Sequence, residues 1–328
     1  MLVAGANGAG KTNLLEALHV GTQGFSPRTR RDARMIRFGT EAARVRLSGL
    51  NGAAAFESEV RLGAAETRRA LLNGERLPSA EHLRSELHAL VFTPDRLAVV
   101  KGGPATRRAY FDRCLGRMLP SRASLPGEYA AAVAQRNAAL RRVALGHSSH
   151  AALAPWTEAA GALGASLVEV RLQVVSLLAD GFSEHAGLLG LDAATLTYEG
   201  DAPTAAEYAD FLERDLERGV TGLGPHLHDV RIAADGRDLR SYGSQGEQRI
   251  AVLALVLGEA GALAERTGSA PLVLLDDVLS ELDGDRRRSL AGAIAGAGQV
   301  VVTAVAARAY PDEPAQSLFV SGGRVRSA

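Results

Sequence analysis

The sequence predicts an α/β fold in which an α-helical lobe is inserted into a sheet-containing lobe. Three observations support this prediction. A glycine-rich turn follows a short apolar segment near the N-terminus, an apolar strand near the C-terminus ends in two carboxylates, and a long Ala- and Leu-rich helical pattern separates them. Such apolar runs are typical of parallel strands buried on both faces. The sheet-containing lobe is expected to comprise residues 1–120 and 220–328, and the insertion residues 121–219.

The composition excludes several classes of protein. At 328 residues the chain is long enough for about two domains. Lys and Arg together number 37, as do Asp and Glu, so any nucleic-acid contact must come from a local basic patch. The single cysteine, Cys114, excludes an internal disulfide framework and favours a reducing compartment. Because the sequence has no uninterrupted apolar run of about 18 residues and no signal-peptide pattern, we expect a cytoplasmic chain that spans no membrane.

The N-terminal glycine-rich turn is predicted to hold a polyphosphate. The segment Gly5–Thr12 matches the pattern G-x-x-x-x-G-K-[ST] between an expected strand at residues 2–4 and an expected helix at 12–20. Glycines let the backbone aim N–H groups at phosphates, Lys11 reaches the β- and γ-phosphates, and the Thr12 hydroxyl binds Mg²⁺. The alternative is a chance glycine turn before a helix. The predicted nucleotide-binding residues are Gly5, Ala6, Asn7, Gly8, Ala9, Gly10, Lys11, Thr12 and Asn13.

A second element near the C-terminus is predicted to hold the metal. Residues 271–275 form an apolar strand that ends in Asp276 and Asp277. Ligands bind at the carboxyl ends of strands in open α/β sheets, so Asp276 is expected to hold Mg²⁺ and Asp277 to polarise an attacking water. The alternative is an Asp-Asp turn that only closes the strand. A helix at 285–295 and a strand at 299–303, whose Thr303 can sense the γ-phosphate, are expected to follow.

A third motif opens a long apolar helix. Ser244, Gln245 and Gly246 precede the run at residues 250–257, so a hydroxyl and free backbone N–H groups meet at the positive end of a helix. This pattern indicates a second anion site. A serine that only caps the helix is an equally good interpretation of the motif by itself.

The segments between the motifs are predicted to form strands and a helical arm. Residues 43–73 alternate in polarity, as short antiparallel strands do. Residues 125–142 and 156–185 have helical spacing and are expected to pack as an antiparallel arm with a turn at 146–150. A further helix is expected at 207–218.

In this order the three motifs resemble the ATPase heads of the ABC superfamily, in particular its SMC-like branch and, more narrowly, the RecF family. This family usually has two strands before the P-loop, so we expect either a start placed late in the sequence or a sheet that lacks an edge. The matching segments run through almost the whole chain: residues 5–16, 91–112, 135–140, 224–226, 242–249 and 274–283.

The resemblance implies an ABC-type P-loop ATPase lobe with an antiparallel β subdomain and an inserted helical arm. ATP and Mg²⁺ are the implied cofactors, with Thr12 and Asp276 on the metal and Lys11, Asp276 and Asp277 as catalytic residues. In such heads the serine–glycine signature of one subunit closes over the ATP of another. Ser244, Gln245 and Gly246 are therefore expected to act in an ATP-dependent homodimer. Hydrolysis is expected to be slow, because Asp277 replaces a longer glutamate and Thr303 a histidine.

The resemblance also implies a DNA-binding recombination mediator with weak, DNA-stimulated ATPase activity. It would act at gapped or single-stranded DNA in repair, replication and the SOS response, with RecO and RecR as partners and RecA as the protein it helps to load. Three alternatives remain: the ATPase subunit of a transporter, a small-molecule P-loop kinase, and a structural clamp that binds ATP without hydrolysing it.

Other polar clusters have two interpretations each. Five arginines in the segment 28–37, with only Asp32 to offset them, form either a DNA-phosphate contact or a solvated face. Arg107 and Arg108 either contact phosphates or pack against Asp112 or Asp95. The five arginines are Arg28, Arg30, Arg31, Arg34 and Arg37.

Two histidines near residue 227 also have two interpretations. His226 and His228 are expected to share one face of a strand, either as zinc ligands or as a hydrogen-bonded pair.

Overall fold

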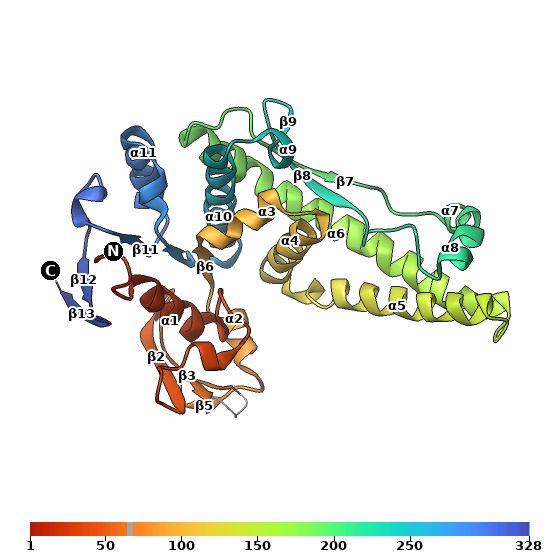
Figure 1. Cartoon of the computed structure of the whole chain (residues 1–328), viewed down its shortest axis with the longest axis horizontal. Helices are drawn as coiled ribbons and strands as arrows, with labels where there is room; N and C mark the ends of the chain where they lie inside the picture. The colour runs from red at the N-terminus through yellow and green to blue at the C-terminus, as the bar shows by residue number, and fades with distance from the viewer. Residues whose placement is uncertain (64–67, 328) are drawn as a thin grey trace. The chain divides into compact units, whose positions relative to one another are not determined.

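The computed structural model describes residues 1–63 and 68–327 and divides the chain into two compact units (Figure 1). The first, here called the sheet lobe, comprises Met1–Leu97, Gly181–Ala194 and Gly243–Ala328. The second, the arm lobe, comprises Ala98–Asp180 and Thr195–Tyr242. These bounds differ from the predicted ones at 120 and 220, because α4 (Pro104–Met118) packs against β8 (Asp229–Ala234) within the arm lobe.

The centre of the sheet lobe is a six-stranded sheet with the order β13-β12-β1-β11-β10-β6. All neighbouring strands are parallel except β12 and β13. Three long helices accompany this sheet in the lobe: α1 (Lys11–Gln23), α10 (Gln245–Thr267) and α11 (Gly284–Ala295). Leu15 of α1 is buried against apolar side chains of five strands, which supplies the core that the apolar runs predict. The strands are β1 (Leu2–Ala4), β6 (Ala89–Phe92), β10 (Leu272–Leu275), β11 (Val300–Ala304), β12 (Ser317–Ser321) and β13 (Arg324–Ser327).

The predicted antiparallel strands form a second sheet in the same lobe. Its order is β2-β3-β4-β5, and its inner face packs against α1. The helix approaches this sheet closely, because a Cβ atom at Gly21 would lie 2.3 Å from the Leu47 side chain. The strands are β2 (Ala42–Asn51), β3 (Ala54–Gly63), β4 (Arg69–Leu72) and β5 (Glu75–Arg76), followed by the short helix α2 (Leu83–Glu86).

The arm lobe contains α5 (Leu125–Ala144) and most of α6 (Ala154–Leu188), close to their predicted bounds. The helix predicted at 207–218 is two helices, because the chain bends at Phe211 between α7 (Ala205–Asp210) and α8 (Leu212–Arg218). The sequence prediction did not include the sheet formed by β7 (Thr195–Glu199), β8 and β9 (Arg237–Asp238), nor the short helices α3 (Ala98–Lys101) and α9 (Leu239–Tyr242).

One helix is apolar enough to qualify as a membrane span by length and composition alone. The segment His150–Leu188, which contains α6, passes this test among the described residues. The sequence prediction did not identify this segment, because it considered only uninterrupted apolar runs. In its most apolar window 44% of the residues are buried inside the protein. Arg171, near the middle of α6, is buried and forms an ion pair with Asp112 at 2.8 Å. These features are those of a helix that packs in a protein core.

Candidate nucleotide-binding site

The predicted phosphate loop has the backbone geometry that requires glycine. Gly8 and Gly10 have φ angles of 76° and 108°, in the region that L side chains rarely adopt. Gly10 is the residue that caps the start of α1. A Cβ atom at Gly5 would lie 2.4 Å from the Val320 carbonyl oxygen, so the loop also passes too close to β12 for a side chain.

The Lys11 side chain folds back over this loop. Its Nζ donates to the carbonyl oxygens of Gly5, at 2.7 Å, and Ala6, at 3.1 Å, and the residue is only 8% exposed. The ammonium charge therefore lies inside the turn formed by the loop and not in bulk solvent. A phosphate held by the loop amides would be within reach of this compact charge.

Hydroxyl groups from two distant segments meet the Asp276 carboxylate. Thr12 Oγ1 donates to Asp276 Oδ1 at 3.2 Å, and Thr303 Oγ1 donates to the same oxygen at 2.9 Å. The three residues come together because β1, β11 and β10 are adjacent parallel strands that end at one edge of the sheet. Asp276 and Thr303 are both buried. A hydroxyl beside a carboxylate is the oxygen donor set that Mg²⁺ prefers, so these residues fit the metal that the sequence predicts.

The backbone at Asp277 is held in an uncommon conformation. Its φ angle of 51° lies in the left-handed region, and its N–H donates to Thr303 Oγ1 at 2.8 Å. Non-glycine residues are held in this region where the surrounding structure fixes them, which is frequent at functional sites. Asp277 also lines a small pocket of about 50 Å³ together with Arg249 and Ile250 from the first turns of α10. The acid predicted to polarise water thus adjoins the helix that carries the serine motif.

The serine motif begins α10 with a reciprocal cap. Ser244 Oγ accepts from the Glu247 N–H at 3.2 Å, and the Glu247 carboxylate accepts from the Ser244 N–H at 2.7 Å. Ser244, Gln245 and Gly246 are all exposed. In an α-helix the N–H groups of the first turn have no partner within the helix, so this end can receive an anion as well as being capped.

The helix that carries the serine motif and the phosphate loop lie beside different strands of the sheet. Helix α10 packs against β6, whereas the phosphate loop follows β1. Strands β11 and β10 lie between β1 and β6, so three strand intervals correspond to roughly 14 Å.

The sequence prediction missed a hairpin that contacts the phosphate loop. Gly322 and Gly323, with φ angles of 56° and 74°, join β12 to β13, and the Gly323 N–H donates to the Ala9 carbonyl oxygen at 3.0 Å. A Gly-Gly pair between two alternating segments is a hairpin signal that could have identified this turn. An open cavity of about 1460 Å³ beside α1 is lined by Asn13 and Glu16 of that helix, by this hairpin and by residues 34–38.

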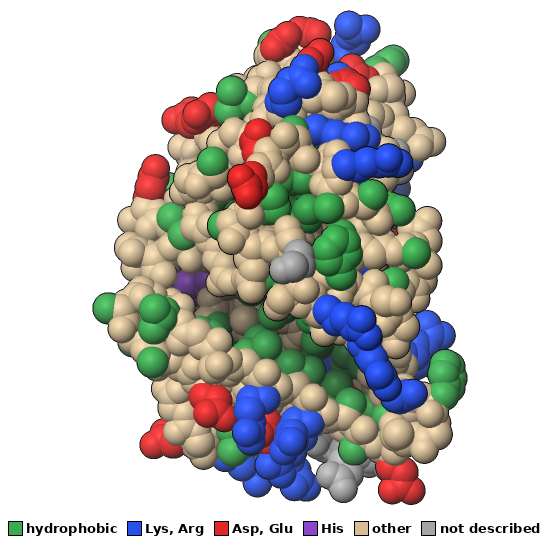
Figure 2. Space-filling view, turned by 90° about the vertical axis from the view of Figure 1, so that its left-hand side faces the viewer, with side chains coloured by type: hydrophobic (Ala, Val, Ile, Leu, Met, Phe, Trp, Pro, Cys, Tyr) green, Lys and Arg blue, Asp and Glu red, His purple; other side chains and the backbone are tan. Residues whose placement is uncertain are grey.

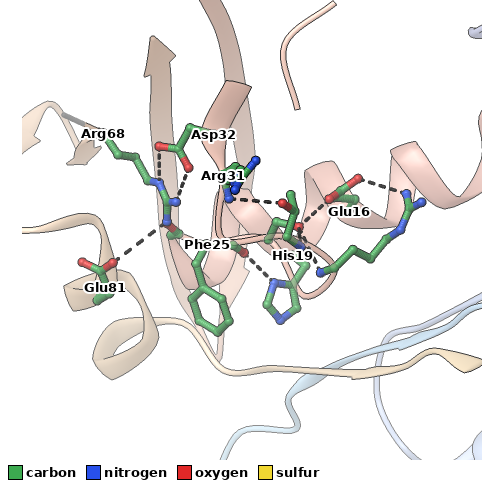
Figure 3. A network of polar contacts seen from close by, with 11 residues as sticks. Glu16, His19, Phe25, Arg31, Asp32, Arg68 and Glu81 are labelled. Atoms are coloured by element: carbon green, nitrogen blue, oxygen red, sulfur yellow. Dashed lines mark hydrogen bonds and ion pairs between the residues drawn. The ribbon is translucent and has the colours of Figure 1, made fainter. Parts of the chain in front are cut away.

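The arginine-rich segment after α1 is partly neutralised. Arg28 Nη1 lies 3.3 Å from Glu16 Oε2, and Arg68 Nε lies 3.1 Å from Asp32 Oδ2. Figure 3 shows the Arg68 guanidinium directed at the Asp32 carboxylate. The acid expected to offset the cluster is therefore bound by an arginine from outside it.

Arg107 and Arg108 pack inside the arm lobe, against partners other than those expected. Arg107 Nε donates to Asp229 Oδ1 at 2.7 Å, and Arg108 donates to the His228 carbonyl oxygen at 2.5 Å. Asp112, one of the predicted partners, is bound by Arg171. The packing interpretation is confirmed. The hydrogen-bonding partners differ from the predicted acids, although the nearby charge of Asp112 still acts on Arg108.

His226 and His228 lie just before β8 and are held by different tyrosines. His226 Nδ1 lies 2.7 Å from the Tyr129 hydroxyl, and His228 Nδ1 lies 2.9 Å from the Tyr198 hydroxyl. Burial lowers the pKa of both imidazoles. Across residues 1–63 and 68–327 no three His, Cys, Asp or Glu side chains gather around these histidines. The tyrosine contacts favour the interpretation as hydrogen-bonded histidines.

The comparisons with known proteins agree with this geometry. A family model described as the RecF/RecN/SMC N terminal domain matches residues 1–319. A DNA replication and repair protein RecF from Heliobacterium modesticaldum is 33% identical over 326 residues, which cover 95% of this chain and 88% of that protein. The Myxococcus xanthus protein of the same name is 37% identical over 321 residues, which cover 92% and 83% of the two chains.

Solved structures give the same result. A structure of the recombination mediator protein RecF-ATP in the RecFOR pathway has a TM-score of 0.85 and 26% identity, and covers all of this chain and 91% of that one. An Smc head domain from Pyrococcus furiosus has a TM-score of 0.58 at 17% identity, covers 100% and 89% of the two chains, and so shares the fold. The chain belongs to the RecF family.

Proposed function

We propose that this chain is an ATP-dependent, DNA-binding recombination mediator that acts at gapped or single-stranded DNA in repair, replication and the SOS response. The observation that supports it most directly is the meeting of Thr12, Asp276 and Thr303 beside a glycine loop that encloses the Lys11 ammonium. This arrangement has the donors that a nucleoside triphosphate with Mg²⁺ requires. The names of the similar RecF proteins and of the RecFOR structure support the DNA-repair role.

Each residue of the site has a distinct task in this proposal. The amides of Gly5–Asn13 bind the phosphates, and Lys11 neutralises the β- and γ-oxygens. Thr12 and Asp276 hold Mg²⁺, which supplies charge compensation on the phosphates. Asp277 orients the attacking water with a carboxylate about one methylene shorter than that of glutamate, so turnover is slow and serves as a switch, with weak stimulation by DNA.

The second half of the site comes from a second copy of the chain. Ser244, Gln245 and Gly246 are exposed, and they begin the helix that packs against β6, three strands from the strand that leads into the phosphate loop. In the proposed homodimer they bind the γ-phosphate held by the partner. Because these contacts form only in the dimer, ATP favours association and hydrolysis favours separation.

The proposed partners follow from the RecFOR pathway named for the similar structure. They are DNA, RecO and RecR, with RecA as the protein whose loading is assisted, and the proposed location is the cytoplasm.

Sedimentation with a non-hydrolysable ATP analogue, with and without gapped DNA, tests the proposal. Wild type is expected to dimerise with the analogue. Lys11→Ala is expected to lose nucleotide binding, and Ser244→Arg to bind nucleotide but remain monomeric, because the larger side chain blocks the shared anion site. Ser121→Arg, the same change at an exposed serine of the arm lobe, is the control. Normal dimerisation of Ser244→Arg would refute the two-chain site, and turnover that requires an acceptor metabolite would favour a kinase.

A further inference from the structure

We propose that the outer face of the antiparallel sheet β2-β3-β4-β5 binds the phosphate backbone of duplex DNA. The contact is made by a row of three arginines, Arg44, Arg61 and Arg69, here called the arginine row. This inference rests on the proposed DNA-binding function and assigns a surface to it.

The register of the sheet aligns these three side chains. Arg44 of β2 is directly opposite Arg61 of β3, and Arg61 is directly opposite Arg69 of β4. All three residues are exposed and, because directly opposite residues point to the same side of a sheet, they lie on one face. At about 4.8 Å per strand interval, the row is roughly 10 Å wide.

The arginine row places like charges side by side. Like charges directly opposite each other in a sheet destabilise it, and an anion bound along the row would offset that cost. Glu59 lies two residues before Arg61 on the same face of β3. Its carboxylate accepts hydrogen bonds from Arg61 at 2.5 Å and from Arg46 at 2.7 Å, so one negative charge is shared by two arginines. Among the described residues of the four strands, five arginines and two glutamates face outward: Arg44, Arg46, Arg61, Arg69, Arg76, Glu57 and Glu59.

The face has the chemistry of a duplex backbone site and not of a single-strand site. Stacking of unpaired bases needs aromatic side chains, and the aromatic residue of these strands, Phe56, packs with the core on the inner face. Guanidinium groups instead match phosphate geometry with paired donors.

The arginine row is partly neutralised, as the basic segment 28–37 is, because Arg61 pairs with Glu59 just as Arg28 pairs with Glu16. The described residues provide no ion pair for Arg44. Figure 2 shows Lys and Arg side chains, with Asp and Glu side chains near them, at the lower end of the face in view.

The test is the salt dependence of duplex binding by the full chain with an ATP analogue, read from the anisotropy of a labelled duplex. Each phosphate contact contributes about 0.9 to the slope of log K against log salt concentration. Arg44→Gln is expected to lower the slope by about 0.9, and the triple variant Arg44→Gln/Arg61→Gln/Arg69→Gln by up to about 2.7, equally for different sequences. Both variants are expected to bind ATP, and Arg44→Gln is expected to melt no earlier than wild type.

The control variant removes the same number of positive charges from exposed positions of the arm lobe and is Arg142→Gln/Arg214→Gln/Arg218→Gln. It is expected to keep the wild-type slope. This inference is overturned if the triple variant of the arginine row keeps the wild-type slope of log K against log salt concentration. It is also overturned if the control variant loses as much of that slope as the triple variant does. If wild type itself binds no duplex, the proposed DNA-binding function fails instead.

Discussion

The buried ion pair of the arm lobe gives the sharpest stability prediction. Arg136 and Asp215 are each 1% exposed at the side chain, and Arg136 Nη1 donates to Asp215 Oδ2 at 2.6 Å. The guanidinium also donates to Thr221 Oγ1 at 2.9 Å and to Thr157 Oγ1 at 3.1 Å. We predict that Arg136→Met destabilises the arm lobe severely, because it leaves the carboxylate buried without a counter-charge.

The expected magnitude follows from what remains around Asp215. Its other donor is the Gly222 N–H, 2.8 Å from Oδ1, which supplies a hydrogen bond but no charge. Removing one partner of a buried pair costs about 3–5 kcal/mol. With a urea m-value of about 2 kcal/mol/M, the unfolding midpoint of the arm lobe should fall by roughly 1.5–2.5 M.

The assay uses the single tryptophan of the chain. Trp156 precedes Thr157 on α6, so its fluorescence in urea reports the unfolding of the arm lobe. Arg142→Met, an exposed arginine on the same helix as Arg136, is the control and should shift the midpoint little. The double variant Arg136→Met/Asp215→Leu removes both charges and should be more stable than either single variant. The electrostatic argument would be contradicted if the stability losses of the two single variants added up in the double variant. An unfolding midpoint of Arg136→Met equal to that of the control would contradict it as well.

Two further predictions concern helix packing and pH. Gly258→Ala should destabilise the sheet lobe by about 1–3 kcal/mol, because the new Cβ atom would lie 2.8 Å from the Phe182 backbone nitrogen. Gly261→Ala on the same helix is the control. Its new Cβ atom would meet nothing within 4 Å, so this change should be neutral or stabilising. Hydrogen exchange of α10 separates the two outcomes. Burial lowers the pKa of His226 and His228 in the folded arm lobe, so the unfolded state binds protons first as pH falls. Stability should be full above about pH 7 and decline below about pH 6.5, and His226→Gln/His228→Gln should flatten this dependence of the Trp156 transition.

The sequence predicted the parts of the site that depend on local patterns. The glycine turn, the strand that ends in Asp276 and the start of α10 are each encoded within about ten residues, because backbone conformation and burial dictate their residue types. The order of these motifs was specific enough to indicate the family before any geometry was known.

Contacts between distant segments could not be predicted in the same way. Asp229 pairs with Arg107 across 122 positions, and Gly323 reaches Ala9 through a strand order that the sequence does not state. Nearby acids such as Asp112 were reasonable partners for Arg107 in sequence but are bound elsewhere in the fold. The sheet of the arm lobe was missed because its strands are short and β7 is far in sequence from β8.

The pairing of β1 has a consequence for the order in which the protein is made. This strand, residues 2–4, has only β11 and β12 as neighbours among the described strands, and those neighbours begin at residues 300 and 317. Domains usually fold from the N-terminus as they emerge from the ribosome. Here the strand that leads into the phosphate loop is synthesised long before its partners, so a chain stalled before residue 300 would carry the glycine loop without the strands that pair with it.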